Sequence, residues 1–223
     1  VSKALRGAQW LSAYVRDQGP EPEAGLKRFF DACANGSPEE DITKRVKQSV
    51  SSLAVSNDAS DAGTRLYYKV LHHILRREEE RLKTSDFGKM LGDGGMHSAL
   101  LCVCYELACH TFLPMTMPFP AVPCALGVTH FDLLVMIENF LRDLESHLSP
   151  DMRQHLVSLA NKIVDSEVWH ARSPVVGYLE DPSLSAFFAQ VVETAPPHTA
   201  HAQQGASRTH TSAPREQPAA SSA

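Results

Sequence analysis

Apolar and polar positions follow one another along most of the chain with the period of amphipathic α-helices. Apolar side chains return every three or four residues, which places them on one face of a helix and leaves the other face polar. The inward stripes are carried by Leu5, Ala8, Leu11, Ser12 and Val15; Leu26, Phe29, Phe30 and Cys33; Ile42, Val46, Val50 and Leu53; Leu66 to Leu75; Phe87, Met90 and Leu91; Leu133, Ile137, Phe140, Leu141, Leu144 and Leu148; Met152, Leu156, Leu159 and Ile163; and Leu184, Phe187 and Phe188. No convincing strand alternation accompanies them. The pattern predicts an all-α fold.

The segment from Met96 to Phe112 differs from the others because it is apolar nearly all round. Leu100, Leu101, Val103 and Leu107 leave it without a polar face. A helix of this kind is typical of the interior of a domain. We therefore expect the amphipathic helices to wrap around it.

Several helix starts are marked by capping residues. Ser37-Pro38-Glu39-Glu40 has the composition of a capping box, with its serine as the N-cap and its proline at the first helical position. Thr129, Ser149-Pro150-Asp151 and Ser85-Asp86 indicate further starts. Breaks between helices are expected in polar, glycine-rich or proline-rich segments. These are Ser56 to Gly63; Gly92, Gly94 and Gly95; and Pro114, Pro118, Pro120 and Pro123.

The chain is expected to form one domain of about eight to ten short helices, followed by a tail. The segment from Ala195 to Ala223 contains no Leu, Ile, Val, Met, Phe, Tyr, Trp or Cys. It cannot bury enough apolar surface to offset the entropy lost on ordering. We place the domain at residues 1–193 and a disordered linker at residues 194–223.

Composition narrows the class of protein. A hydrophobic fraction of 43% and a charged fraction of 21% are ordinary for a globular domain. With 21 Lys and Arg against 26 Asp and Glu, the chain has no basic field that would attract nucleic acid directly. No apolar run reaches the ~18 residues of a membrane helix. The five cysteines have no repeating framework, which favours reduced thiols inside the cell. Because the sequence starts at Val1 rather than Met, we expect it to be part of a longer protein.

No candidate for catalysis or metal binding survives comparison with a simpler interpretation. Asp86-Phe87-Gly88 spells a kinase metal-binding triplet but lacks the glycine-rich loop and catalytic loop that phosphoryl transfer needs. Cys102, Cys104, Cys109 and His110 are expected to point in different directions around one helix, with the thiols buried, rather than to converge on a metal. His72-His73 has no nucleophile nearby and is interpreted as a partly exposed helical pair. We expect no catalytic residue, no metal and no cofactor.

Three Ser-Pro pairs match the minimal target of proline-directed kinases: Ser37, Ser149 and Ser173. For the first two, a serine N-cap followed by proline is also what a helix start prefers. We favour the capping interpretation and keep phosphorylation of the three serines as the alternative.

An ordered series of short blocks resembles the A box of retinoblastoma-family pocket proteins. The blocks are Leu66-Tyr67-Tyr68-Lys69-Val70-Leu71, Arg76 to Leu82, Asp86 to Leu91, His97 to Cys102, Pro118-Phe119-Pro120, Phe131-Asp132, Ile137 to Phe140, and His155-Leu156 on to Trp169. Ala8 to Leu11 and Arg28 to Phe30 resemble the lead-in helices of plant and green-algal members. The resemblance covers roughly Val1 to Phe188.

The resemblance implies a cyclin-like helical fold and a role in protein binding. In pocket proteins the A and B boxes pack together, and the seam between them grips the activation peptide of E-two-F/DP-type transcription factors. The groove for chromatin-modifying co-repressors lies mainly on the B box. The resemblance thus implies the A half of a nuclear transcriptional co-repressor that regulates the G1/S step of the cell cycle and lacks enzymatic activity.

Four positions are assigned to partner binding by this resemblance. Lys69 and Arg76 match basic residues that the family turns toward the acidic activation peptide. Glu138 and Arg142 match charged positions on a helix that lines the seam. Val135 stands where a lysine is common, and the helix after it has Val157 and Ala160 where charged residues are frequent. Part of the polar seam is therefore expected to be missing or remodelled.

Two other functions stay open at this point. A cyclin or a general transcription factor has the same fold, but it would need a kinase-docking surface or a basic patch facing DNA. An enzyme would need a concave pocket with converging titratable groups. The first is the alternative within binding proteins, and the second is the alternative from another class.

Overall fold

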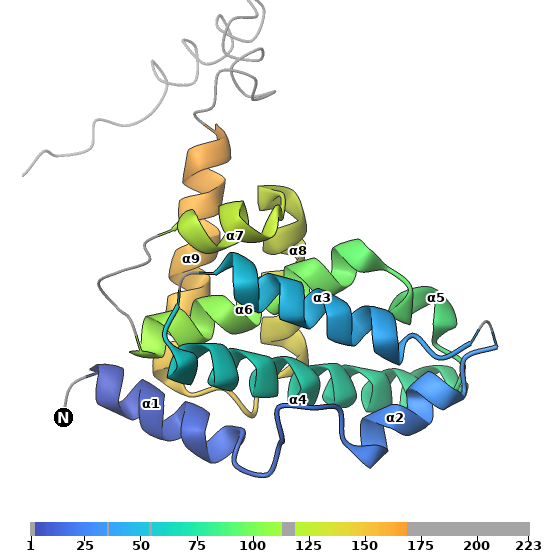
Figure 1. Cartoon of the computed structure of the whole chain (residues 1–223). Helices are drawn as coiled ribbons and strands as arrows, with labels where there is room; N and C mark the ends of the chain where they lie inside the picture. The colour runs from blue at the N-terminus through green and yellow to red at the C-terminus, as the bar shows by residue number, and fades with distance from the viewer. Residues whose placement is uncertain (1–2, 35, 54, 113–118, 169–223) are drawn as a thin grey trace, which may run out of the picture. The chain divides into compact units, whose positions relative to one another are not determined.

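The computed structural model of the chain describes residues 3–34, 36–53, 55–112 and 119–168, all of which lie in one compact unit, Val1–Val176. The described residues form helices and connections without any strand, so the predicted all-α class is confirmed (Figure 1). The helices are α1 (Lys3–Tyr14), α2 (Ala24–Asp31), α3 (Glu39–Ser52), α4 (Asn57–Leu82), α5 (Gly88–Leu91), α6 (Gly94–Phe112), α7 (Ala121–Leu126), α8 (His130–Asp143) and α9 (Pro150–Val168).

Helix α6 forms the centre of the domain, as its all-round apolar sequence predicts. It contacts α1, α3, α4, α5, α7, α8 and α9, and its largest contact is with α4. Side chains from Leu100 to Ala108 are buried on every face of the helix, including the carboxylate-bearing Glu106. The amphipathic helices therefore surround α6 (Figure 1) and pack their apolar faces against it.

The long helix α4 starts earlier than the sequence predicts. We expected a break from Ser56 to Gly63, but the helix begins at Asn57, where the Ser56 hydroxyl accepts the Ala59 amide hydrogen bond at 3.3 Å. Gly63 is buried against the ring of Tyr105 on α6. The predicted break is wrong because these small polar residues cap the helix and let it approach α6, rather than end it.

Two further boundaries differ from the expectation. Gly94 and Gly95 belong to α6, because the Asp93 carboxylate accepts the amides of Gly95 and Met96 at 2.9 and 3.1 Å. Pro123 lies inside α7, at the third position of the helix. A proline in the first turn removes an amide that has no partner within the helix anyway, so it is compatible with a helix start.

Most of the predicted caps are present. Thr129 accepts the Asp132 amide at 3.1 Å at the start of α8, and Ser149 accepts the Met152 amide at 3.3 Å at the start of α9. The predicted capping box at Ser37 is wrong, because the N-cap position of this helix makes no side-chain capping hydrogen bond. Helix α3 begins at Glu39 with Pro38 at the cap position, and Ser37 accepts the Glu39 amide at 3.4 Å.

One buried polar network joins α4, α5 and α6. The His97 side chain, which is 1% exposed, hydrogen bonds through Nδ1 to the Tyr67 hydroxyl at 2.8 Å and through Nε2 to the Leu91 carbonyl at 2.9 Å. A carbonyl only accepts, so Nε2 carries the proton and Nδ1 accepts from the tyrosine. Burial lowers the pKa of His97, which keeps this ring neutral in the folded domain.

Several expectations fall outside the described residues. They are the short helix around Leu184, Phe187 and Phe188, the boundary at residue 193, the disordered linker at residues 194–223 and the environment of Ser173. These remain predictions. Within the part of the chain that is described, none of the helices combines the length and the hydropathy needed to cross a bilayer.

Candidate binding surface on helices α4, α8 and α9

Lys69 and Arg76 lie on the same side of α4. They are seven residues apart, which is close to two full turns, so their side chains leave the helix in nearly the same direction. Both positions are at least partly open to solvent, with 29% of the Lys69 side chain exposed. The role of these two cations in binding one partner, which the sequence resemblance implies, stays a prediction.

The side chain of Lys69 is held by contacts from α1 and the residues after it. Its Nζ lies 5.0 Å from the centre of the Tyr14 ring and 3.9 Å from Asp17 Oδ2. Tyr14 in turn stacks on Trp10 at 5.4 Å, and burial raises the pKa of the Tyr14 hydroxyl to about 12. The Asp17 side chain is 85% exposed, so its ion pair with Lys69 is screened by water and weak. The ammonium group is therefore positioned without being neutralised.

Arg76 is exposed and forms no hydrogen bond or ion pair within the described part of the chain. Its charge is felt by His72, which lies one turn earlier on α4. Burial, together with the charges of Arg76 and Arg28, lowers the pKa of His72. A guanidinium group without an internal partner keeps its five donors available for a ligand.

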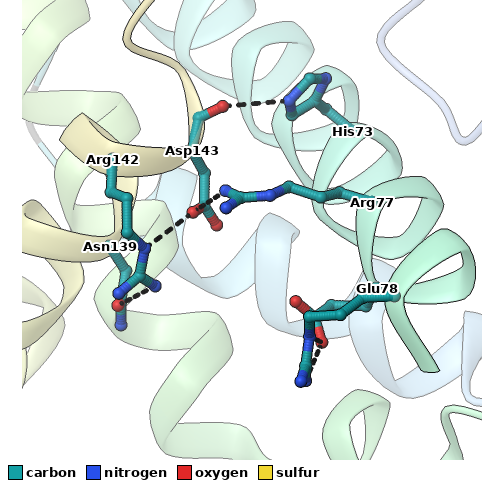
Figure 2. A network of polar contacts seen from close by, with 7 residues as sticks. His73, Arg77, Glu78, Asn139, Arg142 and Asp143 are labelled. Atoms are coloured by element: carbon teal, nitrogen blue, oxygen red, sulfur yellow. Dashed lines mark hydrogen bonds and ion pairs between the residues drawn. The ribbon is translucent and has the colours of Figure 1, made fainter.

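A polar network between α4 and α8 joins Arg142 to Arg77, the residue that follows Arg76 on α4. Figure 2 shows Asp143 between Arg77 of α4 and Arg142 of α8, with both guanidinium groups directed at its carboxylate. Arg142 Nε lies 3.2 Å from Asp143 Oδ1, and Arg142 Nη2 donates to Asn139 Oδ1 at 2.7 Å. His73 adds a hydrogen bond of 3.1 Å to the Asp143 backbone carbonyl.

This network fixes the end of α8 against the middle of α4. The Asp143 side chain is only 12% exposed, so its ion pair with Arg77 is better shielded from solvent than a typical surface pair. Arg142 stays 62% exposed and can still approach a ligand. Burial lowers the pKa of His73, which leaves the histidine that completes the network predominantly neutral.

Glu138 lies one turn before Arg142 on α8 and is exposed. No hydrogen bond or ion pair in the described residues joins it to Lys69, Arg76 or Arg142. On the same face of α8, the preceding turns carry Phe131 and Val135, which are 73% and 41% exposed. The outer face of α8 is therefore apolar in its first half and charged in its second half.

Helix α9 continues this apolar surface. Val157 and Val164 are 39% and 44% exposed, so α8 and α9 carry four of the five large exposed hydrophobic residues in the described chain. The start of α8 and the end of α9 enclose a groove of about 410 Å³. It is lined by Thr129, His130, Phe131, Leu134, Ile163, Val164 and Glu167. The valines that replace charged family residues thus lie on an open surface and not in the core.

Four residues that hold this surface together were not predicted from the sequence. They are Tyr14, Arg77, Asp143 and His73. Tyr14 falls off the apolar stripe of its helix, and Arg77 belongs to a run of charges that resembles a solvated helix end. Ion pairs between residues 66 positions apart leave no local signal, so only the fold reveals them.

The remaining residues that the sequence analysis considered for metal binding or catalysis lie in environments that suit a structural role. Cys102, Cys104 and Cys109 are buried, as predicted, while Cys124 is exposed. In the described part of the chain, no three His, Cys, Asp or Glu side chains are grouped as metal ligands would be. His72 and His73 are both partly exposed, which matches their interpretation as a helical pair.

Comparison with known proteins supports the resemblance. The family model of the retinoblastoma-associated protein A domain matches residues 1–179. Retinoblastoma-related protein 1 of Nicotiana tabacum is 30% identical over 212 residues, which cover 83% of this chain and 22% of that protein. Its Arabidopsis thaliana counterpart is 30% identical over 202 residues, covering 80% of this chain and 20% of that protein. The rice protein of the japonica subspecies is 29% identical over 210 residues, covering 83% of this chain and 21% of that protein.

The chain thus spans about a fifth of the length of these curated relatives. With a cyclin-like, all-helical domain matched over most of its length, the chain belongs to the retinoblastoma-related family of pocket proteins and carries its A domain.

Proposed function

We propose that this chain is the A half of a protein-binding pocket in a nuclear transcriptional co-repressor. The proposed partner of the charged surface is the acidic activation peptide of E-two-F/DP-type transcription factors. Chromatin-modifying co-repressors would bind through the complete pocket, and the combined assembly would restrain the G1/S step of the cell cycle. The chain itself would catalyse no reaction.

The observation that carries this proposal is the pair of available cations on one face of α4. Lys69 is positioned by Tyr14 but is not neutralised, and Arg76 has no internal ion pair in the described residues. Both side chains leave the same side of α4, and their donors suit carboxylates or backbone carbonyls of a peptide. Arg142 extends the cationic surface from α8, and Glu138 beside it provides a contact of opposite charge for setting the peptide register.

The exposed apolar face of α8 and α9 supports the second part of the proposal. A single domain seldom exposes several large hydrophobic residues close together without a partner. We assign Val135, Val157 and Val164 to the contact with the B box of the same protein. Because valines occupy these positions, the seam of this protein would depend more on apolar burial than on charge pairs.

Charge reversal tests the peptide site. In the full-length protein, Lys69→Glu with Arg76→Glu should weaken binding of a synthetic acidic activation peptide by tenfold or more. Each lost charge-assisted hydrogen bond contributes about 1.5–3 kcal/mol. The slope of affinity against salt concentration should also decrease. Isothermal titration calorimetry measures both quantities.

The control is Lys44→Glu with Lys47→Glu, which changes the net charge equally. These two lysines are exposed on α3 and belong to neither α4 nor α8. If the α3 variant weakens binding as much as the α4 variant, attraction to overall charge explains the effect and the assigned site is wrong. Unchanged affinity in the α4 variant would reject the assignment directly.

Phosphorylation of Ser37, Ser149 and Ser173 remains a proposal. Ser37 is exposed ahead of α3, whereas the half-buried Ser149 hydroxyl caps α9. A kinase would therefore reach Ser37 without opening a helix end, and would have to disrupt a cap to reach Ser149. Phosphopeptide mapping after treatment of the full-length protein with a proline-directed kinase separates these cases.

A further inference from the structure

A buried acid and a partly buried histidine face each other between α6 and α9. Glu106 is 4% exposed, and its Oε2 lies 4.0 Å from Nε2 of His155. Neither Glu106 Oε1 nor His155 Nε2 has a hydrogen-bond partner, and they are two of only three such buried side-chain atoms in the described residues. A buried polar atom without a hydrogen bond destabilises the fold, so an unpaired couple of this kind requires an explanation.

The groups around this couple come from the same two helices. His110 lies one turn beyond Glu106 on α6, and its ring stacks on His155 with centroids 3.8 Å apart. Lys162 lies two turns beyond His155 on α9, is exposed, and acts electrostatically on both Glu106 and His155. The thiols of Cys102 and Cys109 complete the α6 side of the cluster.

Burial sets the charge states of the couple. It raises the pKa of Glu106 to about 7, against a smaller lowering by Lys162. Burial, His110 and Lys162 lower the pKa of His155 to about 4. Near neutral pH, Glu106 therefore exchanges a proton with solvent while His155 remains an uncharged imidazole. A protonated carboxyl is a donor, and a neutral imidazole nitrogen is an acceptor.

We propose that Glu106 and His155 form a proton-operated latch between α6 and α9. With its proton, the Glu106 carboxyl donates to His155 Nε2 after a small approach that closes the 4.0 Å gap, and α9 is held against α6. When the proton leaves to solvent, the interior between α6 and α9 holds a negative charge that only the distant ammonium of Lys162 balances, and the uncharged ring of His155 cannot replace the water that an exposed carboxylate would have. Helix α9 then loosens from α6.

The latch acts on a helix whose outer side carries exposed apolar residues. Val157 and Val164 belong to α9, two and nine residues beyond His155. Movement of α9 therefore changes the position of this surface relative to α8. The latch does not depend on the identity of any partner, because its first effect is on the stability of α9 within the chain.

Amide hydrogen exchange along the 223-residue chain tests the latch. After correction for the intrinsic pH dependence of exchange, protection of α9 should decrease about tenfold between about pH 6 and pH 8. Protection of α4 should remain constant as the internal reference. In Glu106→Gln, the amide donates to His155 without having a titrating proton, so protection of α9 should not change with pH. A flat profile in the unaltered protein, or an unchanged profile in the glutamine variant, would overturn the proposal.

A second variant keeps the test decisive if Glu106→Gln fails to fold. Lys162 is exposed, so Lys162→Met should fold, and it removes the charge that favours ionised Glu106. The midpoint of the change in α9 protection should move to higher pH. Lys47→Met on α3 is the matched control and should leave the midpoint in place. A midpoint that Lys162→Met leaves unmoved, or that both variants move equally, contradicts the latch.

Discussion

Gly63 lies inside α4, where glycine ordinarily destabilises a helix by about 0.5–1 kcal/mol relative to alanine. Glycine suits this position because it has no side chain to collide with α6. A Cβ atom at this position would lie 2.5 Å from Cδ1 and 2.6 Å from Cε1 of Tyr105, a ring that is fully buried on α6. The Tyr105 hydroxyl is also fixed by a 2.9 Å hydrogen bond to Thr64, so the ring cannot retreat without losing that bond.

Gly63→Ala should therefore destabilise the domain, although alanine favours helices. We expect a net loss of about 1–3 kcal/mol in the free energy of unfolding, because the added methyl group overpacks the contact between α4 and α6. Urea denaturation measures this loss. Gly19→Ala is the control, since its methyl group would approach only the Glu21 amide at 3.9 Å. Equal stability of the two variants would show that the Gly63–Tyr105 contact is not tight.

The residues that we propose to bind a partner show what single positions reveal in a sequence. The directions of Lys69 and Arg76 follow from their spacing on one helix, and both are at least partly open to solvent. The groups that position Lys69, and Arg77 beside Arg76, do not follow from spacing. Tyr14 reaches Lys69 from α1, and Asp143 reaches Arg77 from the end of α8. Such contacts are set by how helices pack, which a single sequence does not specify.

Helix boundaries depend on a competition between capping and packing. Thr129 and Ser149 behave as the sequence predicts because their side chains satisfy amides that no helical carbonyl can reach. At Ser56 to Gly63 the same residue types were mistaken for a loop. There, Ala59, Ala62, Gly63 and Thr64 are buried by packing, and that packing outweighs the weak intrinsic helix preference of the glycine and the threonine.

Ser149→Ala should destabilise the domain by about 1 kcal/mol, because it removes the acceptor for the Met152 amide at the start of α9. Ser149→Asp should retain most of the stability, since a carboxylate also caps a helix and favours its N-terminal dipole. Thermal unfolding monitored by circular dichroism compares the two variants. An alanine variant as stable as the parent would mean that Pro150 alone suffices to start α9.

The helical class, the central position of α6 and most helix cores could be predicted from periodicity, because burial imposes a regular pattern on each helix. The polar network of Figure 2 could not be predicted, since its members are far apart in sequence. Glu106 shows a different limit. In the sequence, a single glutamate within an apolar helix carries no signal of a special role. Only the packing of α9 over it shows that this acid is buried and unpaired.

Titration of the whole domain should reflect its buried acid and imidazoles. The folded-state pKa of Glu106, about 7, lies above the ordinary value of 4.5, so the stability that its proton contributes is complete below pH 4.5 and is lost as pH rises from 4.5 to 7. The folded-state pKa of His155, about 4, lies below 6.5, so its contribution is present above pH 6.5 and is lost as pH falls through 4. His97 has a lowered pKa and adds to the acid side.

Between about pH 4.5 and 6.5 the stability contributed by Glu106 falls while the stability contributed by His155 rises, so we predict a plateau there with a shallow decline on each side. Each shift taken alone corresponds to a loss on the order of 3 kcal/mol, spread over pH 4.5 to 7 for Glu106 and over pH 6.5 to 4 for His155. Free energies of unfolding from urea titrations at a series of pH values check this shape. Glu106→Gln should remove the decline above pH 6.5 and, because the opposing Glu106 contribution is gone, extend the acid-side decline up to about pH 6.5. Persistence of the alkaline decline in that variant would assign it to other groups.

The distribution of cysteines gives the molecule a built-in chemical reporter. Cys124 on α7 is exposed, whereas Cys33, Cys102, Cys104 and Cys109 are buried. A maleimide dye added under native conditions will therefore attach at one place, on a short helix away from Lys69 and Arg76. Further labelling requires the interior to open, so mass spectrometry of the adducts counts opening events without any engineered tag.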